Sequence, residues 1–270
     1  MFGNLNDRVA IVTGSGANID EACARALAGA GAHVVIADIN VTDAQSVAEQ
    51  IVASGGSAMA HSVDLVEEQS IVHLVAAVIA RFGRIDMLHN NAADTQPDFM
   101  ARDKSIPEMT AEVWDRTFAI NTRGPMLMIK HVAPQMIASG GGSIINTGSG
   151  SAVLGDVFHP AYSCSKGALH TLTRNVAAQL GPHNIRCNAV LPGLVLSKGA
   201  REIITADEID FIQRHVLLPR QSKPEDIAWP LLFLASDAGG FVTSQVFSAD
   251  GGIVHHAPYF ADVMATTARS

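Results

Sequence analysis

The first forty residues carry the pattern that most constrains the fold of this chain. A short apolar run at residues 9–12 ends in a glycine-containing turn that begins with Thr13 and Gly14. A helical segment follows, and a second apolar run at residues 33–37 is closed by Asp38. Strand, glycine turn, helix, strand and acid is the order of a βαβ unit that binds a dinucleotide. The turn would present backbone N–H groups and a helix N-terminus to a pyrophosphate.

Asp38 indicates which dinucleotide such a unit prefers. A carboxylate at the end of the second strand accepts hydrogen bonds from the adenosine ribose hydroxyls and repels a 2′-phosphate. No arginine follows Asp38 directly to reverse that preference. The sequence therefore predicts NAD as the cofactor, rather than NADP.

The composition bounds the class of protein. The chain has 270 residues, of which 48% are hydrophobic and 16% are charged, enough for one α/β domain with a large core. The net charge of −8 argues against nucleic acid or an anionic membrane as a partner. Cys23, Cys164 and Cys187 are widely spaced, which favours a reducing compartment and no structural metal. We find neither a signal peptide nor an apolar run of membrane-spanning length, so we expect a soluble, cytoplasmic protein.

A second motif lies between residues 149 and 166. Tyr162 and Lys166 are four residues apart and would share one face of a helix. A free phenol has a pKa of about 10, and a nearby ammonium favours the phenolate. Lowering that pKa by roughly three units takes about 4 kcal/mol. The pair would then be an acid/base catalyst, and Ser149, thirteen residues upstream, could hold a substrate oxygen.

The chain resembles the short-chain dehydrogenase/reductase family over residues 7 to about 253. The resemblance rests on the glycine turn together with Ser149, Tyr162 and Lys166. We expect a Rossmann-type, doubly wound, mostly parallel sheet of seven strands with helices on both faces. One domain would cover residues 1–270, with a lid at about 194–221 and a C-terminal tail at about 254–270.

The resemblance implies a role for each of four catalytic residues. Tyr162 would be the acid/base, and Lys166 would lower the pKa of Tyr162 and hold the nicotinamide ribose. Ser149 would hydrogen-bond the reacting oxygen. Asn121 would relay protons through a water held by its backbone, within a long helix over about 111–137. The reaction would interconvert a secondary alcohol and a ketone.

The resemblance also implies the residues that bind small molecules. An alcohol or ketone substrate would contact Ser151, His159 and Leu194. The NAD-binding residues would be Gly14, Asn18, Ile19, Asp38, Ile39, Asp64, Leu65, Asn91, Ala92, Tyr162, Lys166, Pro192, Gly193, Val195 and Ser197. Asp64 has a second interpretation, as the N-cap of the next helix. Residues 94–107 are expected to form a loop at the mouth of the site.

The glycine turn departs from the pattern of the family at two positions. Asn18 and Asp20 stand where the family has its second and third glycines. Asparagine tolerates a left-handed backbone better than most residues. The Asp20 carboxylate would either face the cofactor phosphates or point away as a helix-terminal acid.

Two other functions remain open. One is an NADP-linked reductase of the 3-oxoacyl type, which Asp38 argues against. The other is a catalytically weak nucleotide-binding or scaffold protein, which the altered turn suggests and the four catalytic residues argue against.

The C-terminal segment suggests association. His255 and His256 are adjacent and would point to opposite faces of a strand, so we expect no metal site. The Asp250-Gly251-Gly252 turn resembles one that lies at subunit interfaces of the family, and the aromatic tail would pack on a neighbouring subunit or over the substrate pocket. We expect a homo-oligomer, either a tetramer or a dimer.

Overall fold

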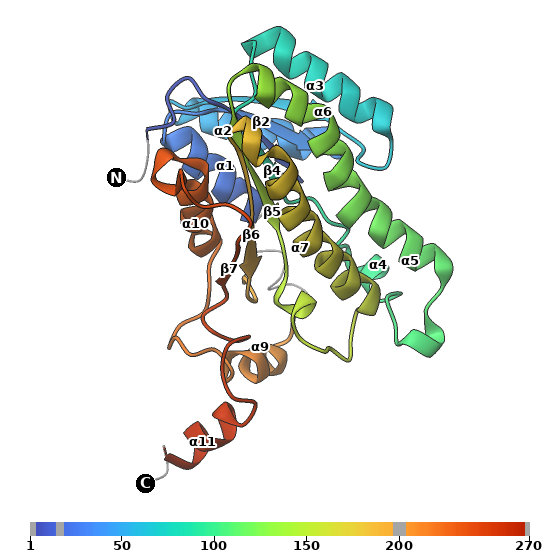
Figure 1. Ribbon diagram of the computed structural model, residues 1–270. Helices are drawn as coiled ribbons and strands as arrows, with labels where there is room; N and C mark the ends of the chain where they lie inside the picture. The colour runs from blue at the N-terminus through green and yellow to red at the C-terminus, as the bar shows by residue number, and fades with distance from the viewer. Residues whose placement is uncertain (1–3, 15–18, 197–203, 268–270) are drawn as a thin grey trace.

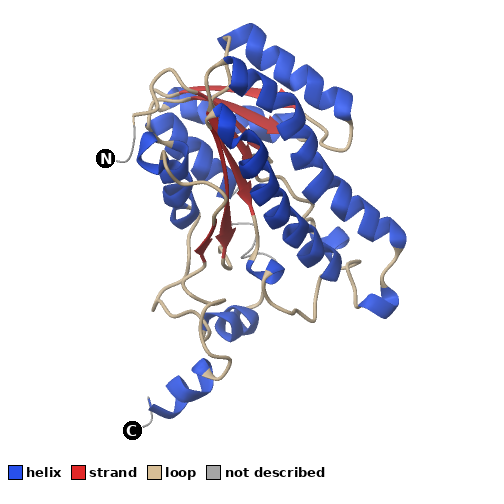
Figure 2. Cartoon of the chain, viewed as in Figure 1, coloured by secondary structure: helices blue, strands red, loops and turns tan. Residues whose placement is uncertain are grey.

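A seven-stranded parallel sheet forms the centre of the protein (Figures 1 and 2). The structure is a computed structural model and describes residues 4–14, 19–196 and 204–267. The strands are β1 (Val9–Thr13), β2 (His33–Asp38), β3 (Ser57–Ser62), β4 (Met87–Asn90), β5 (Gly142–Thr147), β6 (Ile185–Pro192) and β7 (Val246–Ala249). Their order is β3-β2-β1-β4-β5-β6-β7, and each neighbouring pair is parallel. The predicted doubly wound fold is confirmed, with a sheet that is parallel throughout.

Helices cover both faces of this sheet (Figure 1). Those of the described chain are α1 (Ile19–Gly29), α2 (Val41–Ala53), α3 (Glu68–Phe82), α4 (Pro97–Met100), α5 (Ala111–Phe118), α6 (Gly124–Ala138), α7 (Pro160–Leu180), α9 (Ala206–Gln213), α10 (Glu225–Ala235) and α11 (Phe260–Thr267). None of them is long and apolar enough to cross a membrane.

The alternation of side chains along the strands divides the interior into two cores. Val12 and Ile36 join a cluster with residues of α1, α2 and α10, whereas Ile11 and Val35 join one with residues of α3, α6 and α7. All four side chains are fully buried. A strand covered on both faces is apolar at successive positions, which explains the continuous apolar runs in the sequence.

The strand order places a crevice beside β1. The chain proceeds outward from β1 through β2 to β3, then returns to form β4 on the other side of β1. The loops after β1 and β4 therefore leave the carboxyl edge of the sheet in opposite directions. Ligands of open α/β sheets bind at this point.

The structure corrects the prediction of one long helix over 111–137. A π-helical turn, η2 (Ala119–Arg123), separates α5 from α6 and contains Asn121. Residues 94–107 form the short helix α4 and the beginning of a 3₁₀ turn at Ile106–Glu108, in addition to loop. Turns of these kinds leave no periodic hydrophobic signal, so the sequence pattern did not reveal them.

Two further predictions are corrected near helix ends. Asp64 is not the N-cap of α3, because Glu67 occupies that position; the Asp64 carboxylate instead accepts a hydrogen bond from the N–H of Val66 at 2.9 Å. His255 and His256 lie in turns that precede α11, not in a strand. Among the described residues, no three His, Cys, Asp or Glu side chains are grouped as a metal site would require.

We predict that Asp86 stabilises the junction between β1 and β4. Its buried carboxylate accepts the backbone N–H of Val9 at 2.9 Å and pairs with Arg84 at 2.5 Å. Asp86→Ala should lower the free energy of unfolding by about 2–3 kcal/mol in urea denaturation, since it leaves a buried donor without a partner. The matched control is Asp237→Ala, which removes an exposed ion pair with Arg8 and should cost less than about 1 kcal/mol. Equal losses in the two variants would contradict this account.

Candidate active site

Helix α7 and the end of β5 bring three of the four predicted catalytic residues together. Tyr162 lies in the first turn of α7, Lys166 one turn later, and Ser149 just beyond the carboxyl end of β5. The Ser149 hydroxyl accepts the N–H of Ser151 at 3.3 Å and lies 2.9 Å from the Ser151 hydroxyl. The short turn after β5 thus fixes both serines opposite α7.

Lys166 is buried in spite of its charge, with 2% of its surface exposed. Its Nζ donates a hydrogen bond to the carbonyl oxygen of Thr147 at 2.8 Å and lies 5.6 Å from the centre of the Tyr162 ring. Burial lowers the pKa of Lys166 to about 8, against the opposing charge of Asp20. An ammonium is expensive to bury, so its retention here indicates that this position requires a cation.

The pKa of Tyr162 differs from the expectation. This pKa is raised above its ordinary value, because removal from water favours the neutral phenol; the neighbouring Ser149 hydroxyl acts in the opposite direction. Lys166 lies over the face of the ring and does not offset the desolvation. We expected Lys166 to lower this pKa; burial of the phenol, which the sequence does not show, raises it.

Asn121 reaches the same helix from η2. It is 1% exposed, and its Nδ2 donates to the Ser165 hydroxyl at 3.0 Å, which in turn donates to the Tyr162 carbonyl at 2.7 Å. Its Oδ1 is buried without a hydrogen-bond partner. π-turns inside helices are frequent at functional sites, and this one places a buried polar residue against α7.

A polar network that we did not predict lies beneath Lys166. The Thr147 hydroxyl donates to Asn91 Oδ1 at 2.6 Å and lies 2.9 Å from His89 Nε2. Since that hydroxyl proton is already donated, Nε2 of His89 must carry its own proton. Burial and the charge of Lys166 lower the pKa of His89 to about 3, which agrees with a neutral ring. Thr147 therefore links β4, β5 and Lys166.

The predicted cofactor residues after β1 and β4 are in contact. The Thr13 hydroxyl accepts the N–H groups of Asn91 and Ala92 at 3.1 and 3.3 Å. Gly14 has φ +75°, and a Cβ there would lie 2.6 Å from Ala92 Cα. Position 14 therefore requires glycine, because any other residue would clash with Ala92 and would be strained at this positive φ.

The remaining residues predicted at the adenosine end surround the ends of β2 and β3. Asp38 closes β2 and accepts the N–H of Asn40 at 2.9 Å, while the adjacent Ile39 side chain is exposed. Leu65 is buried after β3 next to Asp64. Ile19 is the first residue of α1. Asn18 and Ser197 lie outside the described residues.

The segment after β6 passes from the sheet to the lid. Pro192 ends β6, and Gly193 lies so close to Asp250 that a Cβ would meet its Cα at 2.9 Å. Val195 pairs with Ser222 in a single parallel bridge, and the Ser222 hydroxyl donates to the carbonyl of Leu194. Residues 194, 195 and 222, which lie at the two ends of the predicted lid, are therefore held together.

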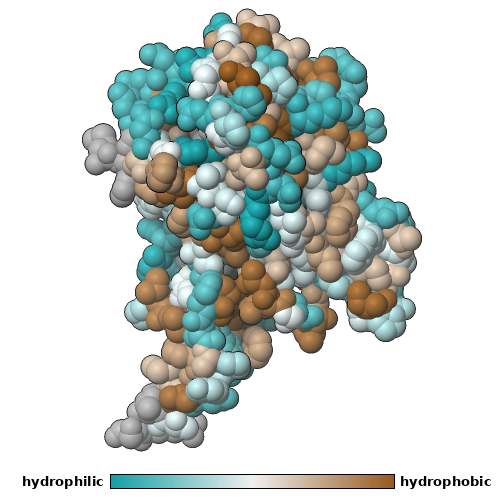
Figure 3. All heavy atoms as spheres, in the orientation of Figure 1, coloured by the Kyte–Doolittle hydropathy of each residue, from teal (hydrophilic) through white to brown (hydrophobic). Residues whose placement is uncertain are grey.

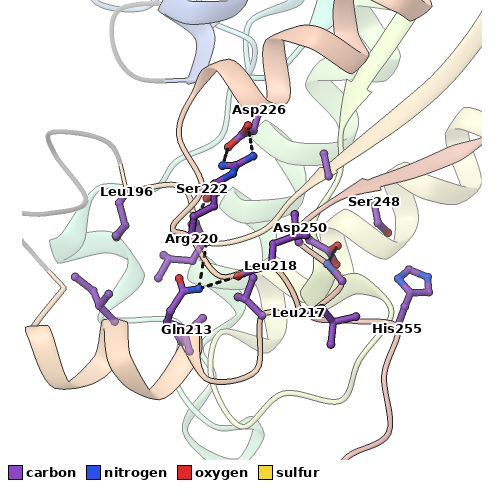
Figure 4. Close-up of a pocket in the computed structure, with 17 residues that line it drawn as sticks. Leu196, Gln213, Leu217, Leu218, Arg220, Ser222, Asp226, Ser248, Asp250 and His255 are labelled. Atoms are coloured by element: carbon purple, nitrogen blue, oxygen red, sulfur yellow. Dashed lines mark hydrogen bonds and ion pairs between the residues drawn. The ribbon is translucent and has the colours of Figure 1, made fainter. Parts of the chain in front are cut away.

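A largely apolar cavity of about 540 Å³ lies between the segments 194–196, 209–226 and 248–255 (Figure 4). Leu194, Leu196, Ile209 and the turn at 250–252 line it, and the Arg220–Asp226 ion pair stands at one side. None of the catalytic residues lines it, nor do Ser151 and His159. Of the three residues predicted to contact substrate, Leu194 alone faces this cavity.

His159 occupies an unusual backbone conformation directly before α7. Its φ is +52°, and its side chain makes no cap hydrogen bond to the helix. Its Nδ1 is buried without a partner. An uncommon backbone conformation at a non-glycine residue marks functional sites more often than other positions.

Asp103, which we did not predict from the sequence, caps the N-terminus of α7 in place of the His159 side chain. Its carboxylate oxygens accept the N–H groups of Ala161 at 3.1 Å and Tyr162 at 2.9 Å, and the residue is 4% exposed. The cap comes from the loop after α4, about sixty residues earlier in the chain. A local capping pattern would have been visible in the sequence, but this one is formed only by the fold.

Comparisons with known proteins agree on the family. The family model described as "Enoyl-(Acyl carrier protein) reductase" matches residues 14–254. A probable short-chain type dehydrogenase/reductase of Bradyrhizobium diazoefficiens is 40% identical, over 97% of this chain and 92% of that protein. The 7alpha-hydroxysteroid dehydrogenase of Clostridium sardiniense is 37% identical, over 96% of this chain and 97% of that protein.

A solved structure leads to the same conclusion. A 7alpha-hydroxysteroid dehydrogenase complexed with NADH and 7-oxo glycochenodeoxycholic acid superimposes with a TM-score of 0.86 at 34% identity, covering 92% of this chain and 95% of that one. The protein belongs to the short-chain dehydrogenase/reductase family. It is therefore an oxidoreductase.

We predict that the Asp103 cap orients the first turn of α7. Asp103→Ala should lower the free energy of unfolding by about 1–3 kcal/mol, because two N–H groups lose a charged acceptor. Asp98→Ala, which changes an exposed acid in α4, should stay within about 0.5 kcal/mol of the wild type. Urea unfolding measures both changes, and an Asp103→Ala variant as stable as Asp98→Ala would disprove the role.

Proposed function

We propose that the protein is an NAD(H)-dependent dehydrogenase that interconverts a secondary alcohol and a ketone. The observation that carries this proposal is the buried Lys166 ammonium. It is hydrogen-bonded to the Thr147 carbonyl and lies 5.6 Å from the centre of the Tyr162 ring. A buried cation beside a phenol, at the carboxyl edge of a doubly wound sheet, suits proton transfer to a substrate bound there.

The residues of the crevice suit a dinucleotide. Gly14 keeps the junction of β1 and β4 free of side chains, and Asp38 stands at the end of β2, where adenosine ribose hydroxyls would be bound. Lys166 stands at the opposite end of the crevice and would hold the nicotinamide ribose. A bound NAD would supply the hydride acceptor. The relative in the solved structure was complexed with NADH, which supports the same choice for this chain.

The catalytic roles follow from the positions of the side chains. Ser149 would hydrogen-bond the reacting oxygen, while Tyr162 removes the hydroxyl proton in oxidation and returns one in reduction. Lys166 would stabilise the phenolate once a ligand completes the site, and Asn121 would connect this end of α7 to a proton relay. Burial holds the pKa of Tyr162 above its ordinary value, which favours the neutral phenol that reduction requires.

The apolar cavity that Leu194 lines supports an apolar substrate. No catalytic residue lines this cavity, but Leu194 is one of the residues proposed to contact substrate, and Figure 3 shows hydrophobic surface in the lower half of the molecule. Phe158, Phe211 and Leu218 are exposed in that region of the chain. We infer that the lid at 194–221 closes over a substrate that Ser151, His159 and Leu194 contact. Relatives named as hydroxysteroid dehydrogenases make cyclic secondary alcohols the first compounds to screen.

We further propose that one catalytic domain spans the chain, and that it works in the cytoplasm as a homodimer or homotetramer. Three free cysteines, two of them buried, suit a reducing compartment. Exposed Tyr259, Val263 and Met264 give the C-terminal segment an apolar surface that a second subunit would cover.

We predict that Tyr162→Phe removes most of the turnover. Loss of the acid/base should lower kcat by roughly 10²- to 10⁴-fold, while the Kd for NADH changes by less than about threefold. Steady-state kinetics and fluorescence titration of NADH measure the two quantities. Turnover within about fivefold of the wild type would contradict the role of Tyr162.

We predict that Asp38 sets the cofactor preference. The wild type should bind NADH at least about tenfold more tightly than NADPH, and Asp38→Ala should reduce that ratio, because the repulsion of the 2′-phosphate is lost. Ala removes the carboxylate together with its charge, and Asp43→Ala in α2 serves as the control. A wild type that prefers NADPH would favour the NADP-linked reductase, and one that binds neither cofactor would favour the scaffold protein.

A further inference from the structure

Asp20 stands out among the groups that the proposed mechanism does not use. It lies in the first turn of α1, and 7% of its surface is exposed. Its Oδ1 is buried and makes no hydrogen bond. A buried carboxylate oxygen without a donor is costly, so this group needs either a proton of its own or a partner that is bound later.

The position of Asp20 along the carboxyl edge of the sheet is informative. The charges of Asp38, at the end of β2, and of Lys166, beside the end of β5, both act on it. Because β1 lies between β2 and β5 in the sheet, Asp20 stands between the expected adenosine end and the expected nicotinamide end of the crevice. That middle section is where a pyrophosphate would lie.

The surroundings of Asp20 favour its neutral form. Burial first, and the charge of Asp38 second, hold the pKa of Asp20 well above its ordinary value, while Lys166 opposes them. Cys23 lies one turn further along α1. Burial and the charge of Asp20 raise the pKa of its thiol. These are the titratable groups of the described chain that act on Asp20 or respond to it most directly.

We propose that Asp20 binds the cofactor as a neutral carboxylic acid and donates its proton as a hydrogen bond to a phosphate oxygen. This inference rests on the proposed function. A carboxylic acid can serve as a donor at this position, whereas a carboxylate would repel the phosphate. Aspartate in place of the glycine of the family therefore makes cofactor affinity depend on pH, with tight binding at low pH and weaker binding after ionisation.

The test is the Kd for NADH from about pH 5 to about pH 9, in the full-length protein. Above the pKa of Asp20 in the cofactor-free protein, the Kd of the wild type should rise about tenfold per pH unit, because binding then requires uptake of one proton. Asp20→Asn keeps the shape and an N–H donor but cannot ionise, so that step should be absent. Asp20→Gly should bind more tightly than the wild type at high pH only.

Lys166 has to be separated from this effect, because its pKa of about 8 falls in the same range. Lys166→Met should remove the part of the pH dependence that belongs to the ammonium and keep the Asp20 step, moved to higher pH because the charge of Lys166 no longer lowers the pKa of Asp20. Calorimetry in buffers of different ionisation enthalpy counts the protons directly: above the pKa of Asp20, the wild type should take up about one proton more than Asp20→Asn, whose remaining uptake belongs to Lys166.

A second readout needs no cofactor. A carboxyl whose folded pKa is raised loses stabilisation as pH rises from its unfolded pKa of about 3.9 through its folded pKa. The free energy of unfolding of the wild type should therefore fall over this range relative to that of Asp20→Asn.

The outcomes distinguish failure of this inference from failure of the proposed function. NADH binding whose pH dependence is the same in the wild type and in Asp20→Asn would overturn the role of Asp20 alone. Asp20→Gly binding more tightly than the wild type at every pH would also overturn it, because a donor would then contribute nothing. Absence of NADH binding in all variants at every pH would overturn the proposed function.

Discussion

The hydrogen bond from the Lys166 ammonium to the Thr147 carbonyl holds the proposed active site together. It joins α7 to the carboxyl end of β5 at 2.8 Å, in a position from which water is excluded. Thr147 also contacts His89 and Asn91 through its hydroxyl, so the same residue ties the cation to β4. Tyr162 and Ser149 lie on the two elements that this bond connects.

Apolar and polar interactions have different roles in this structure. The apolar cores on the two faces of the sheet provide most of the stability, since hydrophobic burial is the dominant favourable contribution to folding. The polar groups at the carboxyl edge fix positions: their hydrogen bonds offset a desolvation cost of similar size, so the network adds little net stability although the loss of one partner is costly. Asp103 illustrates this: a buried acid from a distant loop fixes the turn that carries Tyr162.

The sequence was sufficient for the parts of the fold that depend on local patterns. The apolar runs ending at Thr13 and Asp38 predicted β1 and β2, and the four-residue spacing of Tyr162 and Lys166 placed both on α7. The π turn at Asn121, the cap from Asp103 and the His89–Thr147 contact depend on residues far apart in the chain or on an irregular turn. Only the folded chain brings those groups together, so hydrophobic periodicity could not reveal them.

The pKa of Tyr162 shows the limit of reasoning from a pair of residues. The sequence argument counted the attraction between a phenolate and an ammonium, and the structure adds the larger cost of removing the phenol from water. Removal from water also acts on Asp20 and Lys166, and it favours the neutral form of each group.

A crystal structure of the protein with NADH would test the central claim most directly. The account predicts one dinucleotide along the carboxyl edge of the sheet, with the adenosine ribose hydroxyls on the Asp38 carboxylate and the nicotinamide ribose within hydrogen-bond distance of Lys166 Nζ. A dinucleotide bound in the apolar cavity that Leu194 lines, or in the reverse direction along the crevice, would contradict it.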